Sequence, residues 1–180
     1  MNCAYSNNGQ LQLMALTSLL TKYQKDGSLD KEFLQIPIDL AQEGLLFENN
    51  KNLDVQLKAI SILGEIGGQE ALNSLSNILI SSKDAKILIE AVHASSQITA
   101  EDYKYFINAL GTVMKQQHSQ FKDNEFAFVS LTAIDNMTQK AGNILTSEIL
   151  GIMMIYSEGE YNQKVKEYSR NLLNLILTKR

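Results

Sequence analysis

The chain has 180 residues, of which 44% are hydrophobic, and a formal net charge of -4 at neutral pH. This composition excludes a disordered chain, and the acidic balance argues against a protein that grips nucleic acid through a basic face. No run of about 18 apolar residues is present, so we expect no membrane span.

The first nine residues read as a flexible polar segment that contains the chain's one cysteine, Cys3. From residue 10 onward, apolar residues recur at helical spacing between short turns rich in Gly, Asn, Asp and Ser. The pattern predicts a single domain over residues 10–180. We expect its helices at 10–24, 30–47, 53–66, 70–82, 85–99, 101–118, 124–139, 145–157 and 161–178.

The segment 53–66 has the clearest pattern. Asp54 is predicted to cap its start, Gly67 and Gly68 to end it, and Ala59 to let a second helix approach closely. One helix in the preceding unit contains Pro37, which predicts a kink or a restart there.

The pattern of this segment recurs along the chain. Counterparts of Ala59 are found at Ala15, Ala91, Ser130 and Ser169. Each of these helices except the last is followed by a second apolar stripe, for example Tyr103, Phe106 and Leu110. The repeat predicts an all-α fold made of about four helical hairpins and a last helix that covers the end.

The residues Asp54, Val55, Ala59, Leu63-Gly64 and Ile66-Gly67 resemble the HEAT-repeat family, in the form found in phycobilisome-lyase-like proteins. The match covers about one repeat, and Gln56 replaces the arginine that usually follows the valine. The resemblance implies a right-handed α-α superhelix of the HEAT or armadillo type. It also implies a non-catalytic scaffold that binds another protein.

No combination of residues points to catalysis, a cofactor or a metal. His93 and His118 have no ligand neighbours at metal spacing, and we expect the first to be solvated and the second to cap a helix end. The acidic pairs Glu101-Asp102, Asp123/Glu125 and Glu158/Glu160 fall at expected turns or helix starts, which favours capping over acid–base chemistry. We therefore predict that the chain is not an enzyme.

A strip of neutral residues on the second helices is the predicted partner site. In HEAT-like arrays these helices line the concave side. The strip consists of Asn73, Asn77, Tyr105, Asn108, Thr112, Ser147 and Met154. Gly111 and Gly151 are expected to add bare backbone to this strip, because glycine weakens a helix by about 1 kcal/mol unless something compensates. The alternative occupant of the strip is a second copy of the chain.

Charge is unevenly distributed near the end. Residues 121–160 carry two basic and six acidic side chains, and residues 161–180 carry five basic and one acidic. The favoured interpretation is a basic last helix that packs beside an acidic neighbour; the alternative is a basic surface for an acidic partner or a membrane.

Two further functions stay open. One is an enzyme or enzyme accessory, similar to HEAT-like bilin lyases or DNA glycosylases, although a glycosylase should show a basic face. The other is an interaction module of the cell envelope, tethered as a periplasmic or surface lipoprotein through a modified Cys3. The principal prediction is a cytoplasmic, protein-binding scaffold that does not bind nucleic acid.

Overall fold

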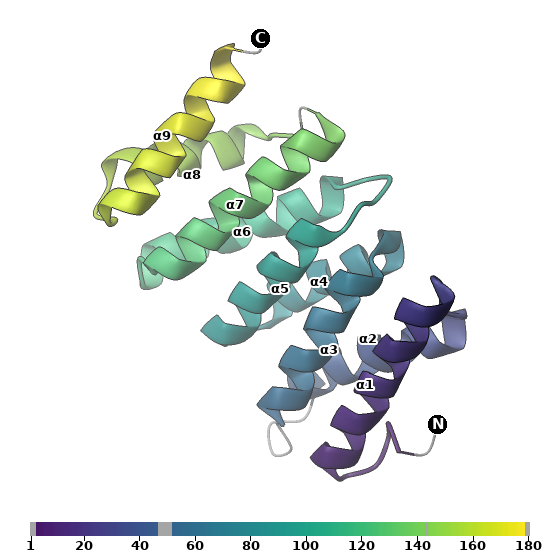
Figure 1. Ribbon diagram of the computed structural model, residues 1–180. Helices are drawn as coiled ribbons and strands as arrows, with labels where there is room; N and C mark the ends of the chain where they lie inside the picture. Colours follow the sequence, from purple (N-terminus) through teal and green to yellow (C-terminus); the bar gives the residue numbers. More distant parts are fainter. Residues whose placement is uncertain (1–2, 47–51, 143, 179–180) are drawn as a thin grey trace.

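The structure is a computed structural model that describes residues 3–46, 52–142 and 144–178. Within these ranges it is all-helical (Figure 1). The helices are α1 (Gly9–Asp26), α2 (Lys31–Leu46), α3 (Leu53–Ile66), α4 (Gly68–Ser81), α5 (Ala85–Gln97), α6 (Lys104–Gln120), α7 (Asn124–Ala141), α8 (Ser147–Glu158) and α9 (Gln163–Thr178). Each predicted helix is confirmed, with ends displaced by at most three residues.

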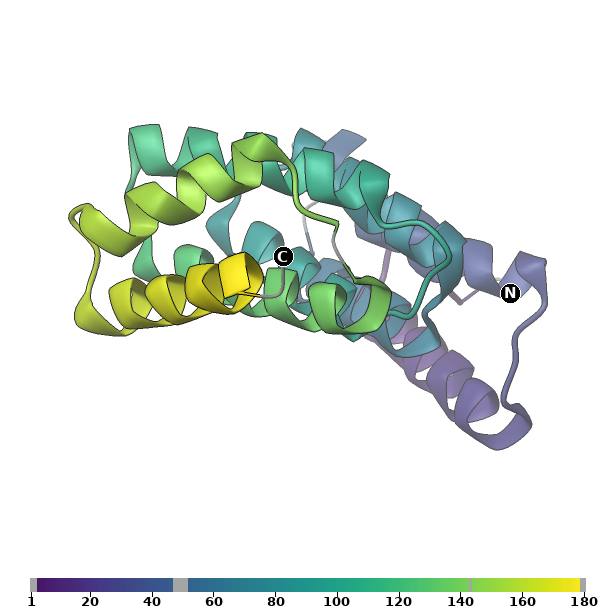
Figure 2. The same ribbon diagram turned by 90° about the horizontal axis from the view of Figure 1, so that it is seen from above.

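The helices form two layers. Figure 1 shows α1, α3, α5, α7 and α9 side by side in front, with α2, α4, α6 and α8 behind them, and Figure 2 shows the two layers from above. Each helix of a layer contacts the next one in the same layer, as α3 contacts α5 and α4 contacts α6. The chain is therefore a solenoid-like stack of four helical hairpins with a ninth helix beside the last.

The small residues of the repeat lie where the front-layer helices meet. Ala59, Ala91, Ser130 and Ser169 are fully buried, and Ala15 in the first helix is half-buried. The closest approach is at Gly64 in α3, where an added Cβ would lie 2.9 Å from backbone atoms of Ala94 in α5. Small side chains at these positions let neighbouring helices pack at short distance.

The start of α3 differs from the prediction. Asn52, and not Asp54, is the N-cap, and its Oδ1 accepts the Val55 N–H at 3.4 Å. Asp54 lies in the first turn, where its charge still complements the helix dipole. The predicted glycine stop is confirmed: Gly67 follows the last residue of α3 with a φ of 72°, a left-handed value that glycine adopts without strain.

Pro37 neither ends nor restarts its helix, because α2 runs unbroken from Lys31 to Leu46. Its neighbours Ile36, Ile38 and Leu40 are all buried, and α2 packs against both α3 and α4. Burial of this apolar face stabilises the helix against the hydrogen bond that proline cannot donate.

Polar side chains join helices that are distant in sequence. The buried Gln56 side chain of α3 donates from Nε2 to the Ala41 carbonyl of α2 at 2.8 Å. Lys140 of α7 donates to three successive carbonyls at the end of α5, those of Ser96, Gln97 and Ile98, at 2.9–3.1 Å. The cation thus satisfies the orphan carbonyls of a neighbouring helix.

The N-terminal segment, expected to be flexible, is packed on the domain in its described part. Ala4 is buried, and Tyr5 Oη donates to Asp39 Oδ2 of α2 at 2.8 Å. Burial and the nearby Asp39 carboxylate raise the pKa of Tyr5 to about 12. Cys3 is exposed, and its tethering role stays a prediction.

Candidate functional site

The predicted strip lies in the back layer, on α4, α6 and α8. All seven of its side chains are exposed, including Tyr105 at 46% and Met154 at 59%. The statement that this layer is the concave side stays a prediction.

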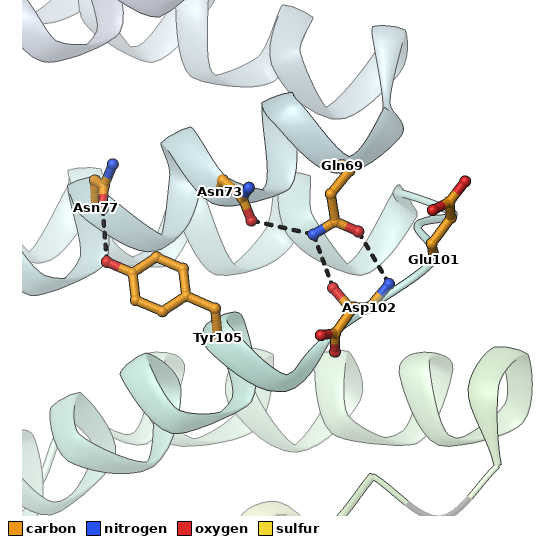
Figure 3. A pocket seen from close by; sticks show the side chains of 6 residues that line it. All are labelled: Gln69, Asn73, Asn77, Glu101, Asp102 and Tyr105. Atoms are coloured by element: carbon orange, nitrogen blue, oxygen red, sulfur yellow. Dashed lines mark hydrogen bonds between the residues drawn. The ribbon is translucent and has the colours of Figure 1, made fainter.

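A groove of about 600 Å³ between α4 and α6 brings three of the strip residues together (Figure 3). Asn73 and Asn77 lie one turn apart on α4, and Tyr105 lies opposite them on the first turn of α6. Three residues that sequence reasoning did not place in the site complete the lining: Gln69, Glu101 and Asp102.

Gln69 fastens one end of the groove. Its Oε1 accepts the Asp102 N–H at 2.9 Å, and its Nε2 donates to the Asp102 carbonyl at 2.9 Å and to Asn73 Oδ1 at 3.1 Å (Figure 3). The amide side chain therefore binds the backbone before α6 as a second peptide group would. This fixes the α5–α6 connection against α4.

Tyr105 spans the groove at its other end. Its Oη donates to Asn77 Oδ1 at 2.7 Å, while the aromatic ring stays partly exposed (Figure 3). The bond restricts the ring, so less side-chain entropy would be lost when a ligand packs on it.

Unused hydrogen-bonding groups remain in the groove. Within the described residues, the side-chain nitrogens of Asn73 and Asn77 donate to no acceptor. The Glu101 carboxylate is likewise without a hydrogen bond or ion pair there, whereas Asp102 Oδ1 accepts the Lys104 N–H at 2.7 Å. The site thus offers two amide donors and carboxylate acceptors around an aromatic ring.

The remaining strip residues are outside the lining of this groove. Asn108 and Thr112 continue along α6, where Thr112 Oγ1 donates to the Asn108 carbonyl at 3.1 Å. Ser147 and Met154 are on α8, beyond α6. The sequence did contain a signal for Gln69, because residues 69, 73 and 77 are spaced by four and share a helix face.

The interpretation of the two glycines was half wrong. Gly111 is buried, and a Cβ there would lie 3.3 Å from Ile149 Cδ1, so this glycine serves the contact of α6 with α8. Gly151 is exposed, and a Cβ there would meet no atom within 4 Å. Only Gly151 adds bare backbone to the surface.

The other chemical candidates have structural surroundings. His93 is exposed, as predicted, with its Nε2 3.5 Å from Gln97 Nε2. His118, expected to be solvated or capping, is half-buried, and its Nδ1 lies 2.9 Å from Tyr161 Oη. Within the described residues, no group of three His, Cys, Asp or Glu could hold a metal ion.

Two further expectations need correction. Phe121, grouped with the aromatic core by its sequence neighbours, is 70% exposed. Glu158 is the last residue of α8, so its charge lies at the unfavourable end of the helix dipole.

The basic residues of α9 are not paired with acidic neighbours as favoured. In the described part of the chain the ion pairs are Lys22–Asp26 and Lys122–Glu160, neither of which involves α9. Lys164 instead lies over the ring of Phe128 in α7, 3.9 Å from its centroid. The charges of Lys166 and Arg170 are left for solvent or a partner.

Comparison with protein-family models, with curated proteins and with solved structures gives no significant match. The HEAT resemblance therefore stays a prediction, and the architecture is what the structure itself establishes. No helix of the described ranges is long and apolar enough to cross a membrane.

Proposed function

We propose that the chain is a protein-binding module whose α4–α6 groove receives a segment of another protein. The observation that carries this proposal is the pair of unused amide donors, Asn73 and Asn77, beside the partly exposed Tyr105 ring. Exposed tyrosines that are already held in place are favourable anchors in interfaces.

The spacing of the two amides suits an extended chain. Residues four apart on a helix are separated by about 6 Å along its axis. Carbonyls on the same side of an extended segment recur about every 6.6 Å. Asn73 and Asn77 are therefore positioned to donate to alternate main-chain carbonyls of a segment that runs along α4, while a side chain of that segment packs on Tyr105.

The composition of the groove argues against a catalytic role. General acid–base chemistry needs a group within reach of a substrate in a site that excludes water. The Glu101 and Asp102 carboxylates are both exposed at an open groove. Recognition needs only complementary hydrogen bonds and contact area, and the groove offers both.

A binding comparison of two double variants tests the proposal. Tyr105→Lys with Asn108→Glu changes the strip at exposed positions of α6, so we expect loss of partner capture from native lysate and a thermal midpoint within a few degrees of the parent. A matched control is Lys86→Glu with His93→Glu, two exposed residues of α5 in the front layer. Lys58 and Ser61 of α3 are half-buried and make a poorer control.

Mass spectrometry of the captured proteins identifies the partner, and isothermal titration with the purified partner measures the affinity. We expect Asn77→Ala, which also removes the acceptor of the Tyr105 hydroxyl, to weaken binding about tenfold. Unchanged affinity in the strip variants together with loss in the α5 control would move the site to the front layer.

A further inference from the structure

The outer side of the last hairpin carries apolar and charged residues that no described element covers. Figure 1 shows α8 and α9 as the last pair of the stack. α8 packs against α6 and α9, and α9 packs against α7 and α8. Each helix therefore has one flank that faces away from the stack.

Helical rotation identifies the residues on that flank of α8. Ile149 points to α6, where it meets Gly111. At about 100° per residue, Leu150, Met154 and Glu158 are turned about 100°, 140° and 180° from Ile149. Met154 is 59% exposed, Leu150 is half-buried, and Glu158 is exposed without a partner among the described residues.

The same reasoning applies to α9. Tyr168 points to α7, since its Oη donates to Asp135 Oδ2 at 2.8 Å and its ring lies 5.4 Å from that of Phe128. The residues turned about 140–200° away from Tyr168 are Lys166, Arg170, Leu173 and Leu177. Leu177 is 59% exposed and Leu173 is half-buried. We call these residues of α9, together with Leu150, Met154 and Glu158 of α8, the end face.

We propose that the end face is the contact surface of a twofold dimer of this chain. A twofold axis parallel to the helices places α8 of one protomer against α9 of its partner, and the reverse. Both α8–α9 turns then lie at the same end of the interface. At this end Glu158 faces the basic positions 166 and 170 of the second copy.

The apolar residues fall into register in the same arrangement. Leu150 and Met154 lie toward the start of α8, and Leu173 and Leu177 lie toward the end of α9, so all four are away from the turn. The twofold brings the leucines of one copy onto the apolar residues of α8 in the other. A twofold perpendicular to the helices would set α9 against α9 with Lys166 opposite Leu177, which leaves both residues without a complementary partner.

Sedimentation equilibrium of the full chain over a wide concentration range tests this proposal. We expect a reversible monomer–dimer equilibrium that weakens as salt is raised, because part of the attraction is between exposed charges. Leu177→Asp should weaken dimerisation at least about tenfold, since it places a charge in the apolar half of the interface.

Charge reversal provides the sharper test. Glu158→Arg alone and Arg170→Glu alone should each weaken the dimer about tenfold, because each creates two like-charge contacts across the twofold. The combined variant should return to within about threefold of the parent, because the opposite charges are restored. Lys86→Glu in α5 is the matched control and should leave the equilibrium unchanged.

Several results would overturn the proposal. They are a monomer at every concentration, a dimer that none of the end-face variants weakens, a combined variant that is no better than the singles, and growth into larger oligomers, which indicates head-to-tail stacking. Dissociation by Tyr105→Lys with Asn108→Glu, and not by Leu177→Asp, would place self-association on the α4–α6 side. The circular dichroism melt of each variant checks that it is folded.

Discussion

At the scale of single residues, Gly64 shows why the front layer packs as closely as it does. Its φ is not in the left-handed region, so it is space, and not backbone conformation, that requires glycine here. An added Cβ would lie 2.9 Å from Ala94 atoms that belong to the backbone of α5 and cannot rotate away. Gly64 thus sets the distance between α3 and α5.

We predict that Gly64→Ala lowers the free energy of unfolding by about 1–3 kcal/mol, because overpacking outweighs the gain in helix propensity of about 1 kcal/mol. Gly151→Ala is the matched control, since its Cβ meets nothing within 4 Å, and it should stabilise the protein by about 0.5–1 kcal/mol. Urea titration monitored by circular dichroism measures both. Stabilisation by both substitutions would mean that α3 and α5 separate at little cost.

The sequence predicted this contact only in part. The recurrence of small residues correctly placed Ala59 and Ala91 in the core. It also marked Gly64, as part of a motif, but not Ala94 as the residue that Gly64 contacts. The partner depends on how two helices cross, and that angle follows from all their side chains together.

At the scale of elements, helix ends were predicted best where a local cap decides them. Asp84 and Asp123 accept N–H groups of the first turns of α5 and α7, and both of those starts are confirmed. The α5–α6 connection was harder, because its polar groups are satisfied from elsewhere in the fold. Gln69 binds Asp102, Lys140 binds the carbonyls of residues 96–98, and Tyr103 Oη donates to the Ile98 carbonyl.

Lys140 gives this dependence a test. We predict that Lys140→Met lowers the free energy of unfolding by about 1–2 kcal/mol, because three carbonyls at the end of α5 lose a charged donor. The control Lys115→Met removes an exposed lysine of α6 that has no partner among the described residues, and it should change the stability by less than about 0.5 kcal/mol. Hydrogen exchange should show faster opening at the end of α5 in the first variant. Equal urea midpoints for the two variants would contradict a capping role.

At the scale of the whole molecule, the repeat predicted the stack of hairpins but not the groove. Periodicity shows which face of each helix is buried, and this alone orders the helices into layers. The groove depends on which outward residues of α4 and α6 meet, about thirty residues apart in sequence. Asn77 and Tyr105 were both assigned to the strip, but nothing in the sequence pairs the hydroxyl of one with the amide of the other.

The last helix is the place where the stack can be shortened without interrupting it. Val165, Ser169, Leu172 and Ile176 of α9 are buried, and Ser169 Oγ donates to the Met153 carbonyl of α8 at 2.7 Å. The contacts of α9 are confined to α7 and α8. In a stack whose units touch only their neighbours, loss of the terminal element should weaken the protein without unfolding it.

We therefore predict that a chain ending at Tyr161 keeps its helical circular dichroism spectrum, apart from the loss of α9. It should melt at a lower temperature and bind more of a hydrophobic dye, because the apolar surface of α7 and α8 that α9 covers becomes exposed. The matched control is Ser169→Ala in the full chain, which removes only the hydrogen bond to Met153 and should cost about 1 kcal/mol. If the shortened chain melted at the same temperature as the full chain and bound no more dye, α9 would contribute nothing to the stability of the stack, and its conserved burial here would have no energetic role. A complete loss of helical signal would show the opposite, that the solenoid folds only as a whole and not unit by unit.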